Sequence, residues 1–130
     1  MYILTLRTDN PEAEIGLYKD TAQISYQTWQ AHRQLAETLH LRIQEVLNAQ
    51  SLSLKDLRGL VVYQGPGSFT GLRIGITVAN ALADSLTIPI CGQLGEDWRE
   101  AGAARIIAGA SDKIVLPEYG ALPNITAPKK

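Results

Sequence analysis

Alternating apolar and polar positions in the first thirty residues predict three short β-strands. They cover residues 2–6, 14–19 and 22–28, and polar residues bound each of them. Residues 9–11 (DNP) and 20–21 (DT) supply the turns between them. Because these connections are short, we expect the three strands to pair as an antiparallel meander.

The apolar period changes to three and four residues after the third strand, which predicts a helix over residues 29–48. Ser53 and Asp56 then have the spacing of a capping box and predict a short turn of helix. The rest of the pattern predicts a strand at 60–63, a helix at 70–86, a strand at 87–92 and a helix at 95–108. A strand, a helix and a strand in this order form a βαβ unit with parallel strands.

These elements predict an α/β fold built on a mixed five-stranded sheet with flanking helices. The helices at 29–48 and 70–86 both carry apolar stripes, and the right-handed crossover rule places them on the same face of the sheet. Prolines recur after residue 116 and prevent a regular helix there. We therefore expect one domain over residues 1–110 and an extended tail over residues 111–130.

Eleven residues, GPGSFTGLRIG at 65–75, form a glycine-rich turn between a buried strand and the long helix. Proline fixes φ and glycine permits positive φ, so the first three of these residues favour a tight turn. Ser68 or Thr70 can cap the helix that follows. A glycine turn at a helix N-terminus is also suited to binding an anion. The candidate anion site consists of Gly67, Ser68, Thr70 and Arg73, although a salt bridge is the commoner role for an arginine in Arg73's position.

The turn differs from the two common nucleotide-binding motifs. A P-loop ends in Gly-Lys followed by Ser or Thr, whereas Gly71 is followed here by Leu-Arg. A dinucleotide-binding turn has the pattern GxGxxG and an acidic residue after the next strand. This chain has Thr70 at the third glycine position and Gly-Gln after the next strand.

Small residues recur every four positions along the helix that follows the turn. Two glycines inside a helix cost about 1 kcal/mol each relative to alanine, so a compensating contact is expected. The simplest one is a second backbone packed at close range, which belongs either to a partner or to this chain. The small-residue face consists of Gly71, Gly75, Ala79 and Ala83.

The chain has 12 Lys and Arg residues and 13 Asp and Glu residues, which gives a net charge of −1. This balance argues against a protein that binds nucleic acid by itself, because such proteins usually carry an excess of positive charge. The single cysteine, Cys91, lies in an apolar run, which predicts a small core residue and fits a reducing compartment. No apolar run reaches the ~18 residues that a membrane helix needs. We expect a cytoplasmic protein without membrane contact.

The residue pattern predicts neither a catalytic set nor a metal site. His32 and His40 are eight positions apart, so no HxxH or HxxxH pair is present. Both histidines lie on one predicted helix, and the sequence indicates no Ser-His-Asp or Cys-His set that would include either of them. Asp9 with Glu12 or Glu14 could form a carboxylate pair near the first turn, but solvated surface acids are the simpler interpretation.

The turn at 65–75 resembles, at every position, the signature of the TsaB (YeaZ-like) family, which belongs to the bacterial machinery that makes threonylcarbamoyladenosine in tRNA. The resemblance extends from residue 35 to residue 93. It implies the ribonuclease H-like half of the actin and sugar-kinase (ASKHA) superfamily. It also implies a non-catalytic subunit that binds the catalytic subunit TsaD, and associates with itself, through the helices flanking the signature. The interface residues implied in this way are Ser68, Phe69, Gly71, Leu72, Gly75, Ala79, Ala83, Leu35 and Leu39.

The resemblance further implies that this chain alone binds no cofactor. ATP would be used by the assembled complex at partner subunits, which include a TsaE-like ATPase, and tRNA would be contacted only indirectly. Two departures stand out. Family members usually have Asp-Thr-Ser after the first strand, where this chain has Arg7, Thr8 and Asp9, and the cation weighs against nucleotide or metal binding. Typical members also continue into a second subdomain, so the chain is expected to be a shortened member.

The alternative to a scaffold subunit is an enzyme of the same superfamily, either a nucleotide-dependent phosphotransferase or a glycoprotease-like peptidase. An enzyme needs catalytic residues, whereas a scaffold subunit does not. Nucleotide binding or turnover by the purified chain, with and without TsaD, distinguishes them.

Overall fold

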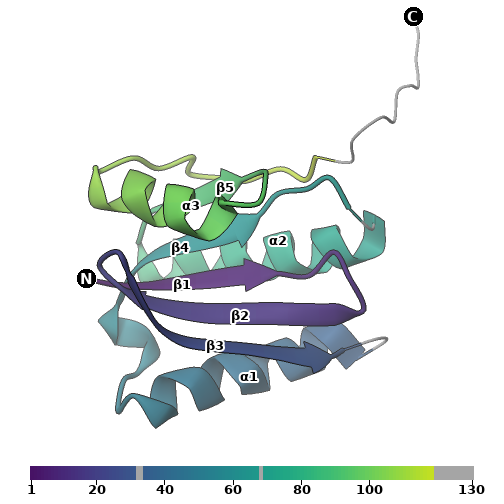
Figure 1. Cartoon of the computed structure of the whole chain (residues 1–130), viewed down its shortest axis with the longest axis horizontal. Helices are drawn as coiled ribbons and strands as arrows, with labels where there is room; N and C mark the ends of the chain where they lie inside the picture. The colour runs from purple at the N-terminus through teal and green to yellow at the C-terminus, as the bar shows by residue number, and fades with distance from the viewer. Residues whose placement is uncertain (32–33, 68, 119–130) are drawn as a thin grey trace, which may run out of the picture.

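The computed structural model describes residues 1–31, 34–67 and 69–118, and within them it contains a five-stranded sheet in the order β3-β2-β1-β4-β5 and three α-helices (Figure 1). The strands are β1 (Tyr2–Arg7), β2 (Glu12–Lys19), β3 (Ala22–Gln30), β4 (Leu57–Tyr63) and β5 (Ile90–Gln93). The helices are α1 (Leu35–Ala49), α2 (Phe69–Leu86) and α3 (Trp98–Ile107). The predicted α/β fold with a mixed sheet is confirmed.

Strand pairing matches the predicted meander and the predicted βαβ unit. β1 and β2 pair antiparallel with Leu4 opposite Leu17, and β2 and β3 pair antiparallel with Ala13 opposite Trp29. β4 lies parallel to both β1 and β5. The predicted capping box is also present before β4, where the Ser53 amide donates to the Asp56 carboxylate at 2.8 Å.

The first helix starts later than the sequence predicts. Trp29 and Gln30 belong to β3, and α1 begins at Leu35. The Trp29 side chain is 6% exposed, and its indole Nε1 donates to the hydroxyl of Thr38 on α1 at 3.0 Å. Trp29 therefore packs on α1 from the sheet, and this tertiary contact overrides the helical spacing that includes it.

The strand predicted at residues 87–92 begins only at Ile90. Thr87 has a φ of 55°, in the left-handed region, and the Ile88 amide donates to the carbonyl oxygen of Ala83 at 3.0 Å. These are features of a Schellman helix end. Thr87 and Ile88 end α2 and turn the chain back toward the sheet, so β5 begins only after them.

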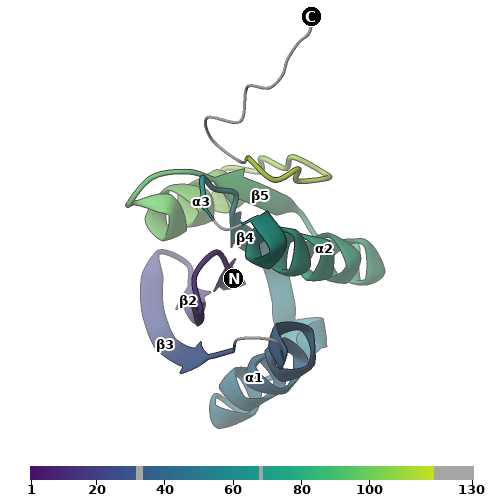
Figure 2. The same ribbon diagram turned by 90° about the vertical axis from the view of Figure 1, so that its right-hand side faces the viewer.

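The helices form two layers on opposite faces of the sheet. α1 and α2 cover one face and α3 covers the other (Figure 2). β4 contacts α3 through Tyr63, whose ring lies edge-on to that of Trp98 with centroids 5.9 Å apart, and through Val61, which packs against Gly102. The prediction that the two long helices share one face is confirmed.

Residues 112–118, called the strap below, pass β5 and α2 without regular secondary structure (Figure 1). The side-chain amide of Asn80 makes two hydrogen bonds to the main chain of Val115. It donates to the Val115 carbonyl oxygen and accepts from the Val115 amide, each at 2.9 Å. Further along, the Gln64 side chain donates to the carbonyl oxygen of Leu116 at 2.8 Å. The main-chain oxygen of Gln64 accepts from the Glu118 amide, also at 2.8 Å.

The strap belongs to the packed body of the protein. Val115 is 2% exposed and lies against Gly92 of β5. Packing is therefore continuous across residue 110, where the sequence predicts the end of the domain, and the division into domain and tail stays a prediction. The remainder of the predicted tail, residues 119–130, lies outside the described residues.

Candidate functional site

The glycine turn lies at the carboxyl end of β4, where the chain leaves the sheet for α2. Gly65 is buried and has a φ of 126°, a conformation that side chains other than glycine rarely allow. The hydroxyl of Tyr63 donates to the carbonyl oxygen of Pro66 at 2.9 Å. The predicted turn is confirmed. Ser68 lies outside the described residues, so its predicted capping role stays a prediction.

A cluster of charged and aromatic side chains lies beside this turn, at the carboxyl ends of β1 and β4. Arg7 ends β1, and its Cζ lies 3.8 Å from the ring centroid of Tyr63, which ends β4. Its Nε donates to Oδ1 of Asp9 at 2.6 Å, and the Asp9 side chain is only 5% exposed. Burial lowers the pKa of Arg7, but the hydrogen bond and charge of Asp9 raise it, and the net change is a rise. The guanidinium therefore stays charged inside the crevice.

Open α/β sheets usually bind ligands in such a crevice, where neighbouring parallel strands lead the chain in opposite directions across the sheet. Here Arg7 and Asp9 occupy it. A Cβ added at Gly67 would collide with the Asp9 carboxylate, so a negative charge lies against the turn at the predicted anion site. Thr70 and Arg73 are exposed on α2. Anion binding stays a prediction, and the Asp9 charge counts against it.

The small-residue face of α2 packs inside this chain, against the end of β1. A Cβ added at Gly71 would collide with the carbonyl oxygen of Thr8, and one added at Gly75 would collide with the Thr8 hydroxyl. Ala79 is fully buried and Ala83 is 4% exposed. The predicted close approach of a second backbone is confirmed. Of the two alternatives left by the sequence, that backbone belongs to this chain.

Most of the residues that the resemblance assigned to an interface are therefore core residues. Leu35, Leu39 and Leu72 are buried, as are Gly75, Ala79 and Ala83, and Gly71 is half-buried. The assignment of these residues to an interface stays a prediction, and their burial within their own chain counts against it. Ser68 and the side chain of Phe69 lie outside the described part of the structure. The outward-facing residues of α1 and α2, such as Thr70 and Thr77, are exposed.

A shallow groove runs between the outer faces of α1 and α2. Its central part, of about 300 Å³, is lined by Ala36, Thr70, Arg73, Ile74, Thr77 and Val78. An adjoining hollow of about 220 Å³ shares Thr70 and Ile74 with it and extends to residues 8–11. We call this surface the α1–α2 groove. Ile74 and Val78 are half-buried and form its apolar floor.

Sequence reasoning missed Ile74 and Val78. Both are aliphatic, they are four positions apart, and they lie outside the stripe that contains Leu72, Ile76 and Ala79. A second aliphatic row beside the core stripe widens the apolar face of a helix beyond what one sheet can cover. That row is the signal from which the groove could have been predicted.

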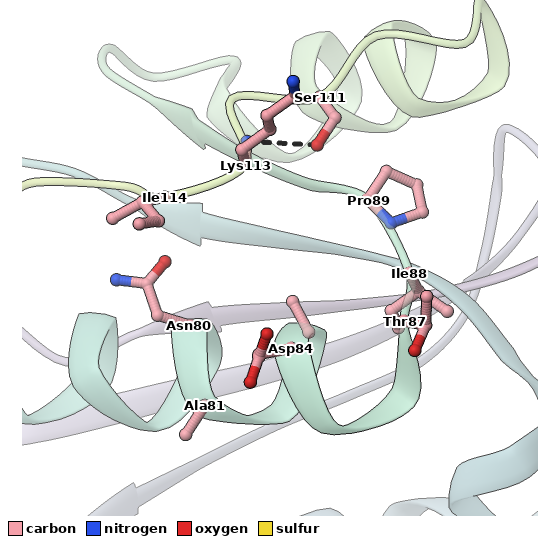
Figure 3. A pocket seen from close by; sticks show the side chains of 10 residues that line it. Asn80, Ala81, Asp84, Thr87, Ile88, Pro89, Ser111, Lys113 and Ile114 are labelled. Atoms are coloured by element: carbon pink, nitrogen blue, oxygen red, sulfur yellow. Dashed lines mark hydrogen bonds between the residues drawn. The ribbon is translucent and has the colours of Figure 1, made fainter.

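A larger hollow, of about 660 Å³, opens between the carboxyl end of α2 and the start of the strap (Figure 3). Asn80 points from α2 toward the strap, and the Lys113 amide donates to the hydroxyl of Ser111 at 3.1 Å on the opposite wall. Ile88 and Pro89 line one end. The lining residues include neither histidine nor cysteine, so the hollow holds no Ser-His or Cys-His pair.

The remaining candidate chemistry is dispersed. Over residues 1–31, 34–67 and 69–118, no three His, Cys, Asp or Glu side chains gather closely enough to hold a metal ion. His40 is exposed on α1, and His32 lies outside the described residues. Cys91 is fully buried, as predicted, and burial raises the pKa of its thiol. None of the helices in the described ranges has both the length and the apolar character for a membrane span.

Comparison with known sequences gives these features a family context. A family model described as "TsaD: tRNA N6-adenosine threonylcarbamoyltransferase" matches residues 28–92, which is half of the chain. The "tRNA threonylcarbamoyladenosine biosynthesis protein TsaB" of Escherichia coli is 33% identical over 119 residues, covering 83% of this chain and 49% of that protein. The chain spans about half the length of this relative.

Two solved structures share the fold. YeaZ from Pseudomonas aeruginosa superposes with a TM-score of 0.67 and 24% identity, over 78% of this chain and 50% of that one. RuvC from T. thermophilus, solved with a Holliday junction substrate, gives a TM-score of 0.53 and 11% identity, over 92% of this chain and 85% of that one. These likenesses confirm the predicted ribonuclease H-like fold. With the signature turn, the family model and the TsaB relatives in agreement, the chain belongs to the TsaB (YeaZ-like) family.

Proposed function

We propose that this chain is a non-catalytic subunit of the machinery that makes N6-threonylcarbamoyladenosine in tRNA, and that it binds a TsaD-like catalytic subunit through the α1–α2 groove. Family membership supports the pathway, since the Escherichia coli relative is named for threonylcarbamoyladenosine biosynthesis. In this proposal the protein works in the cytoplasm, contacts tRNA only through the complex, and leaves ATP use to partner subunits such as a TsaE-like ATPase.

The α1–α2 groove is the observation that carries the proposal. Ile74 and Val78 form an apolar floor between two helices, and Ala36 of α1 borders it. Polar Thr70 and Thr77 stand at its rim. An apolar groove between helices with a polar rim is the kind of surface onto which a partner helix packs its own apolar face.

The Arg7 cluster supports a non-catalytic role. The crevice at the carboxyl ends of β1 and β4 is where this fold class would hold a phosphate-bearing ligand. The ion pair of Arg7 with Asp9 and the stacking of Arg7 on Tyr63 fill it with the chain's own side chains. A nucleotide would have to displace this internally paired cluster, so ATP chemistry is assigned to the partners.

Calorimetric titration of a TsaD-like protein with this chain tests the proposal. Thr77→Glu and Val78→Glu place a carboxylate in the groove, where contact with a partner would strip its water. We expect each to weaken binding at least about tenfold, which corresponds to about 1.4 kcal/mol. Ala104→Glu, at an exposed position of α3 on the opposite face, is the matched control and should bind normally. Normal binding by both groove variants would refute the proposed interface.

The enzyme alternative, a nucleotide-dependent phosphotransferase or a glycoprotease-like peptidase, makes a different prediction. It requires nucleotide or peptide turnover by the isolated chain. Turnover that copurifies with the protein and disappears in Asp9→Asn would contradict the scaffold role, because Asp9 is the buried carboxylate of the crevice.

A further inference from the structure

The end of the strap lies against the glycine turn, although the two are about fifty residues apart in sequence (Figure 1). The Glu118 amide donates to the main-chain oxygen of Gln64, the residue just before the turn, at 2.8 Å. A Cβ added at Gly65 would collide with the carbonyl oxygen of Glu118. The turn can therefore follow its path beneath the strap only because residue 65 has no side chain.

The glycine turn is held on its other side by the end of β1. A Cβ added at Gly67 would collide with the carboxylate of Asp9. That carboxylate is bonded to Arg7, whose guanidinium stacks on Tyr63. The Tyr63 hydroxyl in turn donates to the carbonyl oxygen of Pro66 at 2.9 Å. The turn is thus enclosed between the strap and the Arg7 cluster.

Asp9 connects the turn to the α1–α2 groove. Besides its contact with Gly67, it lines the hollow of about 220 Å³ that adjoins the centre of the groove, together with Thr70 and Gly71. A continuous series of contacts therefore leads from Glu118 through the turn and Asp9 to the groove. Energetic coupling between two sites is carried by contiguous contacts of this kind when one element has two states.

The strap has the features of an element that can open by itself. Residues 112–118 have no regular secondary structure, and among them only Val115 is buried. Its neighbours Ile114 and Leu116 are 68% and 69% exposed. The two hydrogen bonds from Asn80 and the contact with Gly92 hold Val115 in place. A segment with so few buried contacts opens at a lower free-energy cost than the sheet unfolds.

We propose that the strap regulates the binding of a TsaD-like subunit at the α1–α2 groove. The closed strap holds the turn against Asp9 and keeps that end of the groove in its binding form, whereas opening of the strap loosens the turn and weakens binding. This inference rests on the proposed function, because it concerns regulation of the same surface. Val115 and Gln64 are then positioning residues, since both lie outside the groove.

Calorimetric titration of a TsaD-like protein with strap variants tests the coupling. Val115→Ala removes two buried methyl groups, and we expect it to weaken binding at least about fivefold, the lower end of typical allosteric effects. Gln64→Ala removes the bond to the Leu116 carbonyl oxygen but leaves Val115 in place, and it should act in the same direction. Ile114→Ala, at the exposed neighbouring position, is the matched control and should bind normally.

Hydrogen exchange measures the reciprocal effect, because coupling between two sites acts equally in both directions. The amides of Val115 and Glu118 donate to acceptors outside the strap, so their exchange reports its opening. A saturating TsaD-like protein should slow both at least about fivefold, and should have no effect in Val78→Glu. Stabilisation of the whole fold without coupling would slow only amides that exchange by global unfolding. Unchanged exchange at Val115 and Glu118 would therefore overturn the proposal.

The variants separate failure of this inference from failure of the proposed function. If Val115→Ala and Gln64→Ala bind like the original while Val78→Glu does not, the coupling is wrong and the groove remains the interface. If Ile114→Ala weakens binding as much as Val115→Ala does, the partner contacts the strap directly, which also overturns the coupling. Normal binding by Thr77→Glu and Val78→Glu would refute the groove, and the regulation proposed for it as well.

Discussion

The hydroxyl of Thr8 donates to the carbonyl oxygen of Gly71 at 2.7 Å, and this hydrogen bond joins the residue after β1 to the first turn of α2. The strand end comes this close because Gly71 and Gly75 present no side chain toward it. The long helix is thereby fixed against the centre of the sheet, with its aliphatic outer row facing away from it. The signature glycines thus act inside the monomer.

Gly75→Leu is expected to destabilise the protein. The new side chain would occupy the space of the Thr8 hydroxyl, and overpacking a core typically costs about 1–3 kcal/mol. A gain of about 0.8–1 kcal/mol in helix propensity offsets this only in part. Urea unfolding measures the change, and Thr77→Leu, at an exposed position two residues along, is the control. An unchanged free energy of unfolding for Gly75→Leu would show that α2 is not packed on Thr8.

Alkaline stability should depend on Tyr18. Its hydroxyl donates to Oε2 of Glu100 at 2.6 Å, and burial followed by this hydrogen bond raises its pKa from 10.0 to about 12. The folded state therefore holds the phenol proton more tightly than the unfolded chain does. The resulting stability is fully present below pH 10 and is lost as pH rises toward 12.

Unfolding free energies measured between neutral pH and pH 12 check this dependence. Tyr18→Phe removes the ionisable group, so its stability should fall less steeply above pH 10 than that of the original protein. Tyr2→Phe, a similar change at a tyrosine on β1, should follow the original curve. Parallel curves for the Tyr18→Phe protein and the original would contradict the assignment.

Cys91 should report opening of the strap. The thiol is fully buried on β5, its Sγ lies 3.8 Å from the carbonyl oxygen of Ala110, and burial raises its pKa. Asp112→Ala removes the acceptor that holds Arg105 and the Gly92 amide. A hydrogen bond to a charged group contributes about 1.5–3 kcal/mol. Labelling of Cys91 by a thiol reagent should therefore accelerate about tenfold or more.

Lys113→Ala, beside Asp112 but outside this ion pair, is the control for the labelling experiment and should react at the original rate. Equal rates for Asp112→Ala and the original protein would mean that the strap does not shield β5. The hydrogen bond from Arg105 lowers the pKa of Asp112 below its usual 3.8. The stability that this carboxylate confers is thus present above pH 3.8 and lost as pH falls further.

The fold was predictable from local patterns, and the site was predictable only in part. Strand alternation, helical period and the capping box of Ser53 identify the sheet and its helices, because each reflects contacts within a few residues. The close packing of Gly71 and Gly75 against Thr8 joins residues that are 63 or more positions apart in sequence. The sequence alone could not tell whether the backbone packed against these glycines belongs to this chain or to a partner. Core and surface rows of one helix can have the same residue types, because they differ only in what the rest of the chain covers.

The Arg7 cluster shows the same limit. The sequence shows Arg7 where the family resemblance leads one to expect an acid, and weakened nucleotide or metal binding stays a prediction. Arg7 stacks on Tyr63 because β1 and β4 are neighbouring parallel strands that end side by side. In this position Arg7 also pairs with the buried Asp9. No spacing rule connects these residues before the sheet order is known.

The β5 edge of the sheet is closed to strand addition. An exposed edge strand offers its outward amides to any extended chain that meets it, which is a common route to aggregation. On β5 the outward amides of Ile90 and Gly92 already donate to Ser111 and Asp112. A short stretch of polar side chains thereby protects this edge from unwanted pairing with other molecules.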